Sequence, residues 1–346
     1  VKFFLYTMAG SILMLLAILY VGLQAGTFAL PEIIANVQNG TLVFPGDGLF
    51  STQSFLFLGF LIAFAIKVPI WPLHSWLPDA HVQAPTAGSV ILAGVLLKMG
   101  TYGIVRFCLP MFPDASVQWA PIIATLAVIG IIYGAWVSYA QQDVKKLVAY
   151  SSVSHLGFVV LGIFALNAQG LSGATLQMVN HGLSTGGLFL LVGMLYERRH
   201  TKDINAYGGI WKVMPLLGGI SLFVTLSSMG LPGLNGFIGE FTILMGTFGS
   251  DVLGFFFALF ATLGVILAAV YMLYMFQKVF MGEVTKPENE NLEPLHWQEI
   301  AVMIPLIIAI LWIGLQPAPF FQTMDASVNA LVTHVQEHFP TVAQLP

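Results

Sequence analysis

Ionisable side chains stand inside apolar stretches of this sequence, and their types favour proton transfer. The five residues of this kind are Lys67, Lys98, His155, His181 and Glu240. A charged group near the centre of a bilayer costs about 2.5–3.5 kcal/mol on insertion scales, so such residues are rare and usually functional. All three side-chain types can take up and release a proton, and none of them builds a cage for a larger substrate. The set therefore predicts translocation of protons or small cations.

The two lysines differ in how deeply they lie. Lys98 follows Pro85 by 13 residues and stands in the middle of its apolar stretch, and buried lysines commonly exchange protons. Lys67 stands near the end of its stretch, two residues before Pro69. Its alkyl stem is long enough for the ammonium to reach the membrane surface, so Lys67 is either a lysine of this kind or a functional residue. The interruption at Pro69 favours function slightly, because freed helix carbonyls beside Lys67 can stabilise an ammonium.

His155 and His181 stand in the middle of neighbouring apolar stretches, among serine, glutamine and asparagine residues. Either histidine alone is as easily a hydrogen-bonded packing residue as a functional one. Two together favour a proton relay, because the two imidazole nitrogens can accept and release protons on different sides. Glu240 follows a run of glycine and proline; it is either a proton site or a carboxylate that favours a helix start.

A second group, His74, Asp79 and His81, lies in a segment rich in proline. The spacing matches no standard metal motif, so we expect a structural, hydrogen-bonded loop. The sequence contains no phosphate-binding glycine motif, and no cofactor ligands are recognisable. Its single cysteine, Cys108, excludes a disulfide framework, a cysteine zinc site and an all-cysteine iron–sulfur cluster.

The composition places these residues in a membrane protein. Of 346 residues, 12 are Lys or Arg and 16 are Asp or Glu, which is 8% charged, while 57% are hydrophobic. A soluble domain carries about 25% charged residues and cannot cover its surface with so few. A net charge of −4 without a basic block argues against nucleic-acid binding, and the pattern lacks the alternation of an outer-membrane barrel.

A membrane-spanning helix needs about 20 mostly apolar residues. By that measure we expect nine spans, followed by an amphipathic tail at the surface over 317–346. The spans lie roughly at 3–23, 52–72, 86–109, 118–140, 144–166, 171–196, 213–249, 252–281 and 298–316.

Two of the spans are interrupted, one at Pro69 and the other by glycines and a proline over 230–236. Non-helical backbone at membrane depth is tolerated only beside protein or a water-filled cavity. A pair of such segments in corresponding positions favours an inverted-repeat transporter, although each proline can also simply kink a helix. We expect an all-α polytopic membrane protein with an inverted-repeat, antiporter-like fold.

Lysine and arginine in the loops indicate the orientation, because they favour the cytoplasmic side. They place Lys2 and the loops at 74–84, 141–146, 197–212 and 278–299 on the cytoplasmic side. Arg106, which lies near the opposite face, is the one exception. The chain begins with Val1 and an apolar stretch without a charged leader, so we expect further helices before it rather than a signal peptide.

Four motifs give the sequence a recognisable family resemblance: KVPIWPLHSWLPDAH at 67–81, LLKMGTYGIVR at 96–106, AYSSVSHLGF at 149–158 and LPGLNGFIGEF at 231–241. The chain resembles the antiporter-like membrane subunits of respiratory complex I (NADH-quinone oxidoreductase), above all the M-type subunit, which is the homologue of mitochondrial subunit 4. The first motif also occurs in related Mrp antiporter subunits.

The resemblance implies fourteen spans with two inverted five-helix repeats. Within a single membrane domain over 1–346, residues 1–109 would end the first repeat, 110–281 would form the second, and 282–346 would hold the last helix and tail. Lys67 matches a lysine that pairs with a glutamate on an earlier helix, and Lys98 matches the bridging central lysine. His155 and His181 match polar-axis positions, and Glu240 matches the acidic residue of the second broken helix.

The resemblance also implies a function in which protons enter from the cytoplasm, pass Lys67, Lys98, His155 and His181, and leave near Glu240. This subunit would hold no cofactor; NADH, flavin, iron–sulfur clusters and quinone would belong to partner subunits. Its partners would be the bilayer and other membrane subunits, in a bacterial inner membrane. The alternatives are an Mrp-type cation/proton antiporter and a purely structural subunit.

Overall fold

The computed structural model describes residues 1–46 and 48–339, and this part of the chain consists of helices and connecting loops. Its membrane-crossing helices match the nine expected spans, seven of them uninterrupted and two broken. The seven are α1 (Lys2–Ala25), the α5–α7 helix (Thr86–Met111), α8 (Pro113–Tyr139), α9 (Val144–Phe164), α10 (Ala168–Arg199), α14 (Phe255–Phe280) and α15 (Trp297–Leu315). The broken pairs are α3 (Thr52–Lys67) with α4 (Trp76–Gln83), and α12 (Pro215–Ser228) with α13 (Asn235–Phe248).

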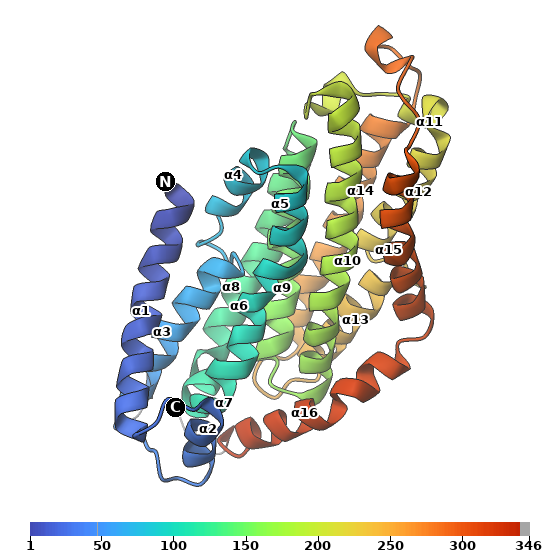
Figure 1. Cartoon of the computed structure of the whole chain (residues 1–346). Coiled ribbons are helices and arrows are strands. Elements are labelled where there is room, and N and C mark those ends of the chain that lie inside the picture. The colour runs from blue at the N-terminus through green and yellow to red at the C-terminus, as the bar shows by residue number, and fades with distance from the viewer. Residues whose placement is uncertain (47, 340–346) are drawn as a thin grey trace.

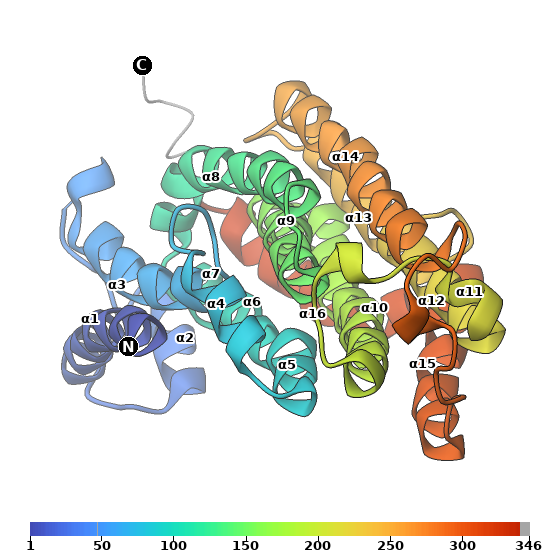
Figure 2. The ribbon, with the colours of Figure 1, turned by 90° about the horizontal axis from the view of Figure 1, so that it is seen from above.

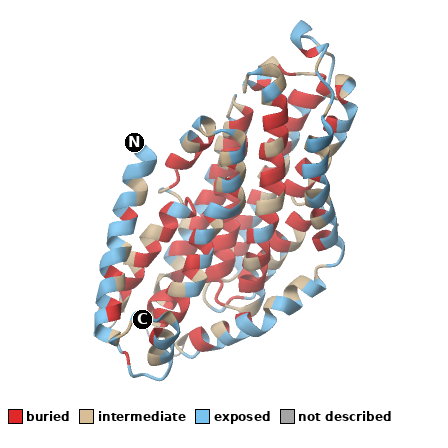
Figure 3. Ribbon diagram, in the orientation of Figure 1, coloured by how far each residue is buried: buried red, intermediate tan, exposed pale blue. Residues whose placement is uncertain are grey.

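Helix α9 stands at the centre of the bundle, packed against α8, α10, α13 and α14 (Figures 1 and 2). Of its most apolar stretch, 94% is buried, against 17% for α1. Small residues allow this packing, because a Cβ at Gly157 would lie 2.9 Å from the Ala127 carbonyl oxygen and one at Gly134 would lie 2.8 Å from the Ser154 nitrogen. Figure 3 shows the same contrast between a buried centre and exposed outer helices. Polar groups on α9 therefore lie away from solvent and lipid.

The first break follows Lys67, the last residue of α3. Pro69 cannot continue the helix, because it lacks a backbone donor and its ring clashes with the preceding turn. The indole of Trp76 donates to the Ile66 carbonyl at 2.8 Å, which satisfies an acceptor that the break exposes. The protein thus supplies the hydrogen bonds that non-helical backbone needs at membrane depth.

The second break separates α12 from α13, and Gly230 and Gly233 there adopt φ of 79° and 92°. These values lie in the left-handed region that favours glycine. Asn180 of α10 donates to the Asn235 carbonyl at 2.8 Å and so fixes the start of α13. Along the chain, α3 runs toward the end of the bundle that holds the N-terminus, whereas α12 and α13 run away from it (Figure 1). The two broken helices therefore have opposite directions.

The basic loops gather at one end of the bundle, as expected. Contacts between them show this: Lys2 pairs with Asp79, Lys202 donates to the Val82 carbonyl, and Arg198 pairs with Glu299. We call this end the basic end, and the opposite one the α16 end after the helix that lies across it, α16 (Ala318–Gln336) (Figure 1).

One expectation needs correction, because residues 74–84 are not a loop and α4 occupies most of them. A further helix, α2 (Leu30–Gln38), lies between the first two spans. Only Phe112 separates the α5–α7 helix from α8, which begins at Pro113, a residue well suited to a first helical position. The tail forms the amphipathic α16 at the surface, and its last residues, 340–346, lie outside the described part.

Candidate functional site

Four of the five predicted residues lie in one row at the centre of the bundle, in which His181, His155 and Glu240 are buried and Lys98 is half-buried. The row begins at Lys98 of the α5–α7 helix, whose Nζ lies 2.5 Å from Nδ1 of His181 on α10. Lys98 Nζ also donates to the Ala93 carbonyl within the π-helical turn Leu92–Leu96. Such turns offset the regular hydrogen-bond ladder and frequently mark functional sites. Here the turn supplies the acceptor that holds the ammonium against the histidine.

The row continues at His155 of α9 and Glu240 of α13. His155 Nδ1 lies 2.7 Å from Glu240 Oε1, and both side chains are about 95% buried. His155 Nε2 lies 3.0 Å from the hydroxyl of Tyr271 on α14. Both imidazole nitrogens therefore have partners, so this histidine is held in one orientation between an acid and a phenol.

A small polar cavity lies between the two halves of the row. The rings of His181 and His155 are 5.9 Å apart between centroids, and both line the cavity with Gln177 and Asn180. The cavity measures about 10 Å³, which is roughly the space of one water molecule. His181 Nε2 is buried without a partner among the described residues. A water in the cavity can therefore bridge His181 to the His155–Glu240 pair.

The carboxylate of Glu240 faces the second break. Gln177 donates to Oε1 at 3.0 Å, while Oε2 is buried and has no hydrogen-bond partner in the described part of the chain. A Cβ at Gly230 would lie 3.7 Å from Oε2, so this oxygen points at the non-helical backbone. The helix-start reading of Glu240 fails on geometry, because α13 begins five residues earlier, at Asn235.

The contacts give the row a spatial order that differs from the order along the chain. Lys98 touches His181, and Glu240 touches His155. Chain order fails here because α10 lies between the α5–α7 helix and α9, so its histidine meets the lysine first.

Lys67 is the predicted residue that does not join the row in the described structure. Its side chain is exposed, and no described residue lies within hydrogen-bond or ion-pair distance of its ammonium. Its Cβ would lie 3.1 Å from a Cβ at Gly100, two residues beyond Lys98 on the same helix. The two lysines therefore come from neighbouring turns of packed helices.

Sequence reasoning missed three residues of this site. Tyr271 and Gln177 contact the row directly, yet a lone tyrosine or glutamine in an apolar helix gives no distinguishing signal. The third is His81 of α4, which was expected to be hydrogen-bonded. It is fully buried, neither ring nitrogen has a partner among the described residues, and its ring stacks on Phe189 of α10 at 4.5 Å.

His81 lies between the row and the basic end. Phe189 stands eight residues after His181 on α10, about 12 Å nearer the basic end. A cavity of about 350 Å³ opens there, lined by Lys145, Lys202 and Gln83 among others. Among the described residues, no group of three or more His, Cys, Asp or Glu is placed to hold a metal ion.

Two broken helices of opposite direction, with a row of ionisable side chains at the centre of the bundle, define the class of antiporter-like membrane subunits. The family described as "NADH:quinone oxidoreductase/Mrp antiporter, TM" matches residues 1–281, and the chain belongs to this family.

Relatives and solved structures agree with this assignment. The chain is 45% identical to NADH-quinone oxidoreductase subunit M of Rhodobacter capsulatus, over 99% of this chain and 67% of the relative. It is 44% identical to NADH-ubiquinone oxidoreductase chain 4 of Arabidopsis thaliana, over 97% of this chain and 66% of the relative. The chain thus spans about two thirds of these relatives, and the expected M-type resemblance is confirmed.

Solved structures show the same fold. Respiratory complex I from Thermus thermophilus with bound NADH contains a chain that matches with a TM-score of 0.87 and 35% identity, over 96% of this chain and 68% of that one. The Mrp complex from Dietzia sp. DQ12-45-1b matches with a TM-score of 0.83 and 18% identity, over 97% and 69%. At that identity the second likeness concerns the fold alone.

Proposed function

We propose that this chain is a proton-translocating membrane-arm subunit of an NADH-quinone oxidoreductase. The observation that carries the proposal is the buried row Lys98–His181–His155–Glu240, in which neighbouring groups touch or are separated by the space of one water. A row of buried proton carriers costs insertion energy and is expected where protons move.

The contacts suggest how a proton passes along the row. The Lys98 ammonium donates to Nδ1 of a neutral His181, whose Nε2–H then faces the cavity. A water there relays the proton to His155 once the Tyr271 hydroxyl releases Nε2 of that ring, and the carboxylate of Glu240 then stabilises the imidazolium across 2.7 Å. At such separations in a poorly screened interior, the charge on one group changes the proton affinity of the next.

Uptake and release follow from what lies at the ends of the row. The cavity beside Lys145 and Lys202 opens at the basic end, and His81 stands between it and the row. Glu240 Oε2 faces the break at Gly230, which gives release toward the other side. Lys67, packed beside the helix of Lys98, serves in this scheme as a further proton-exchanging group.

In this proposal, the energy that drives proton translocation comes from outside this chain. The subunit itself performs no redox chemistry; NADH, flavin, iron–sulfur clusters and quinone are held by partner subunits. Its neighbours are other complex I membrane subunits, including antiporter-like ones, and the bilayer is that of a bacterial inner membrane. Residues 1–109 and 110–281 form oppositely oriented halves, which the opposite directions of the broken helices support.

Replacement of Lys98 by alanine in the assembled complex tests the proposal. NADH-driven proton uptake into vesicles, divided by electrons delivered to quinone, should fall below the parent ratio. If this variant moves as many protons per electron as the parent complex, the proposed role of the row in proton translocation is contradicted. Lys146→Gln is a matched control, because Lys146 is a cation of α9 at the basic end, outside the row.

A second candidate function is cation/proton exchange of the Mrp type, favoured only by the shared fold. Transport assays in vesicles without NADH and quinone distinguish the two functions. Sodium-dependent proton movement under those conditions would support exchange, and its absence, together with NADH-driven pumping, would support the complex I function. Full pumping after neutralisation of Lys98, His155 and Glu240 together would make the chain a structural subunit.

A further inference from the structure

Three buried hydroxyls on α12 have no hydrogen-bond partner. Ser221, Thr225 and Ser228 are at most 6% exposed, and their side-chain oxygens form no hydrogen bond within the described part of the chain. Among the described residues, no other serine or threonine hydroxyl is buried in this way. Because the surrounding helices already enclose these oxygens, only a small molecule inside the bundle can reach them.

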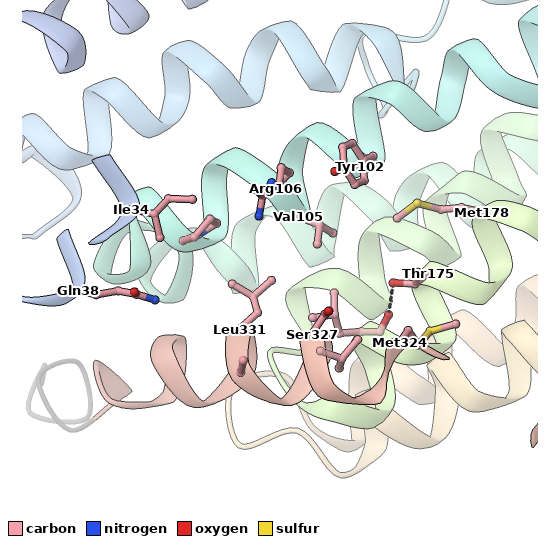
Figure 4. Close-up of a pocket in the computed structure, with 14 residues that line it drawn as sticks. Ile34, Gln38, Tyr102, Val105, Arg106, Thr175, Met178, Met324, Ser327 and Leu331 are labelled. Carbon is pink, nitrogen blue, oxygen red and sulfur yellow. Dashed lines mark hydrogen bonds between the residues drawn. The ribbon is translucent and has the colours of Figure 1, made fainter. Parts of the chain in front are cut away.

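Hydroxyls inside other helices of the protein bond to their own backbone. Thr247 of α13 donates to the Ile243 carbonyl at 2.8 Å, four residues earlier. Thr175 of α10 donates to the Leu171 carbonyl at the same distance, and Figure 4 shows this bond in the wall of a cavity of about 500 Å³. The three α12 hydroxyls make no such bond. A buried hydroxyl without a protein partner is costly and is commonly satisfied by a bound water.

The three residues form a line on α12, which we call the hydroxyl line, and one end of it opens to the row. At 3.6 residues per turn they lie within about 60° of one face and extend over about 10 Å of the helix. Ser228 lines the small cavity between His181 and His155. Side chains three or four residues apart on a helix are about 5–6 Å apart, which is the length of two successive hydrogen bonds of about 2.8 Å. One water between each pair therefore makes the line continuous.

The other end of the hydroxyl line meets an aromatic pair at the basic end. Gly218 stands on the same face of α12, one turn before Ser221, and a Cβ there would lie 2.9 Å from the Trp211 ring. Trp211 belongs to α11 (Ile210–Val213), in the connection at the basic end, and its ring meets that of Phe276 edge to face at 5.6 Å between centroids. The Trp211 ring therefore separates the line from the basic end.

We propose that the hydroxyl line holds a file of water molecules and carries protons from the basic end to the small cavity, past a gate formed by the Trp211 ring. The inference rests on the proposed function and adds a second uptake route to it. This route enters the row between His181 and His155 rather than at Lys98. Hydroxyls suit the task, because each can accept one hydrogen bond while it donates another. A proton taken up at one end of the file then releases one at the other, without a charged side chain in the path.

Cysteine substitution tests whether the line holds water. Ser221→Cys, Thr225→Cys and Ser228→Cys are prepared singly in the intact complex, in sealed vesicles whose basic end faces outward. Silver ion, which is close to water in size and reacts with thiols, is added outside. Thiols left free are alkylated after denaturation and mapped by mass spectrometry. Val224→Cys is the matched control, because Val224 is equally buried on the same helix but packs against Gly187 of α10. Silver should react with the three line thiols and not with the control.

Two further variants test the water file and its gate. Trp211→Ala removes the ring and should speed the silver reaction of Ser221→Cys. Thr225→Val keeps the shape of the side chain but removes its hydrogen bonds. It should slow the reaction of Ser228→Cys by up to about tenfold, because one net hydrogen bond is worth roughly that factor. If the line thiols react no faster than Val224→Cys, the water file is absent and the proposal is overturned.

Proton pumping separates this inference from the proposed function. Thr225→Val should lower the number of protons moved per electron, whereas Thr247→Val, whose hydroxyl is already bonded within α13, should keep the parent value. A parent value in Thr225→Val overturns the uptake role of the line, even where its thiols react with silver. If Lys98→Ala lowers the number in the same assay, the proposed function stands and only the line fails. If neither variant lowers it, the proposed function fails as well. Circular dichroism and the amount of assembled complex show that each variant is folded.

Discussion

Replacing Glu240 by glutamine removes one charge from the row and almost nothing else. Glutamine has the same shape, can still accept the hydrogen bond from Gln177, and can still accept one from a neutral His155. What is lost is the carboxylate charge 2.7 Å from the imidazole. The variant therefore separates the electrostatic role of Glu240 from its structural one.

The size of the effect follows from that geometry. The charges are spread over a ring and a carboxylate, so their effective separation is about 4 Å, and at an effective dielectric constant of about 20 the attraction is about 4 kcal/mol. Each 1.4 kcal/mol is a factor of ten in an equilibrium, so a proton that passes through this pair loses stabilisation worth up to about a thousandfold in occupancy. If every pumped proton passes this point, proton flux falls by up to that factor.

The assay measures two quantities in vesicles: the rate of NADH oxidation and the number of protons moved per electron. We expect a lower proton ratio in Glu240→Gln and partial recovery in Glu240→Asp, which keeps the charge. Glu299→Gln is the matched control. It also breaks a carboxylate pair, with Arg198, but lies outside the row, so it should affect stability without changing the ratio. A parent ratio and rate in fully assembled Glu240→Gln would refute the reasoning.

Other predictions follow from the same contacts. Lys98→Ala removes the start of the row and should abolish most proton translocation while the complex still assembles; pumping assays and native gels check both. Gly182→Ala places a Cβ 2.9 Å from the Gly94 carbonyl oxygen, so the helices must separate, lowering the thermal midpoint at a cost of about 1–3 kcal/mol. The hydrogen bond to Asp114 raises the pKa of His338, so this contact between the end of α16 and α8 is complete below about pH 6.5 and is lost as pH rises through the raised value. Hydrogen exchange of α16, corrected for intrinsic rates, should therefore increase with pH, and Asp114→Asn should remove that dependence.

The sequence by itself determined the class of protein, the nine spans and the positions of both breaks. The physical reason is that these properties depend on local composition. Few charges and long apolar stretches place the chain in a membrane, and closely spaced glycines and prolines, as over 69–72 and 230–236, interrupt a helix locally. The same locality identified Lys98, His155, His181 and Glu240, because a charge within an apolar stretch is visible without knowing its neighbours.

Only the tertiary structure decided which of these groups meet. The contact order Lys98–His181–His155–Glu240 depends on α10 lying between the α5–α7 helix and α9, and no local pattern specifies that neighbour. Tyr271 and His81 entered the site for the same reason, since their importance comes from burial and position rather than residue type. Lys67 is as conspicuous in the sequence as Lys98, yet among the described residues it lies outside the row and packs against the Lys98 helix at Gly100. The residue type indicates that a side chain can carry a proton, whereas the packing determines which neighbouring group can receive that proton.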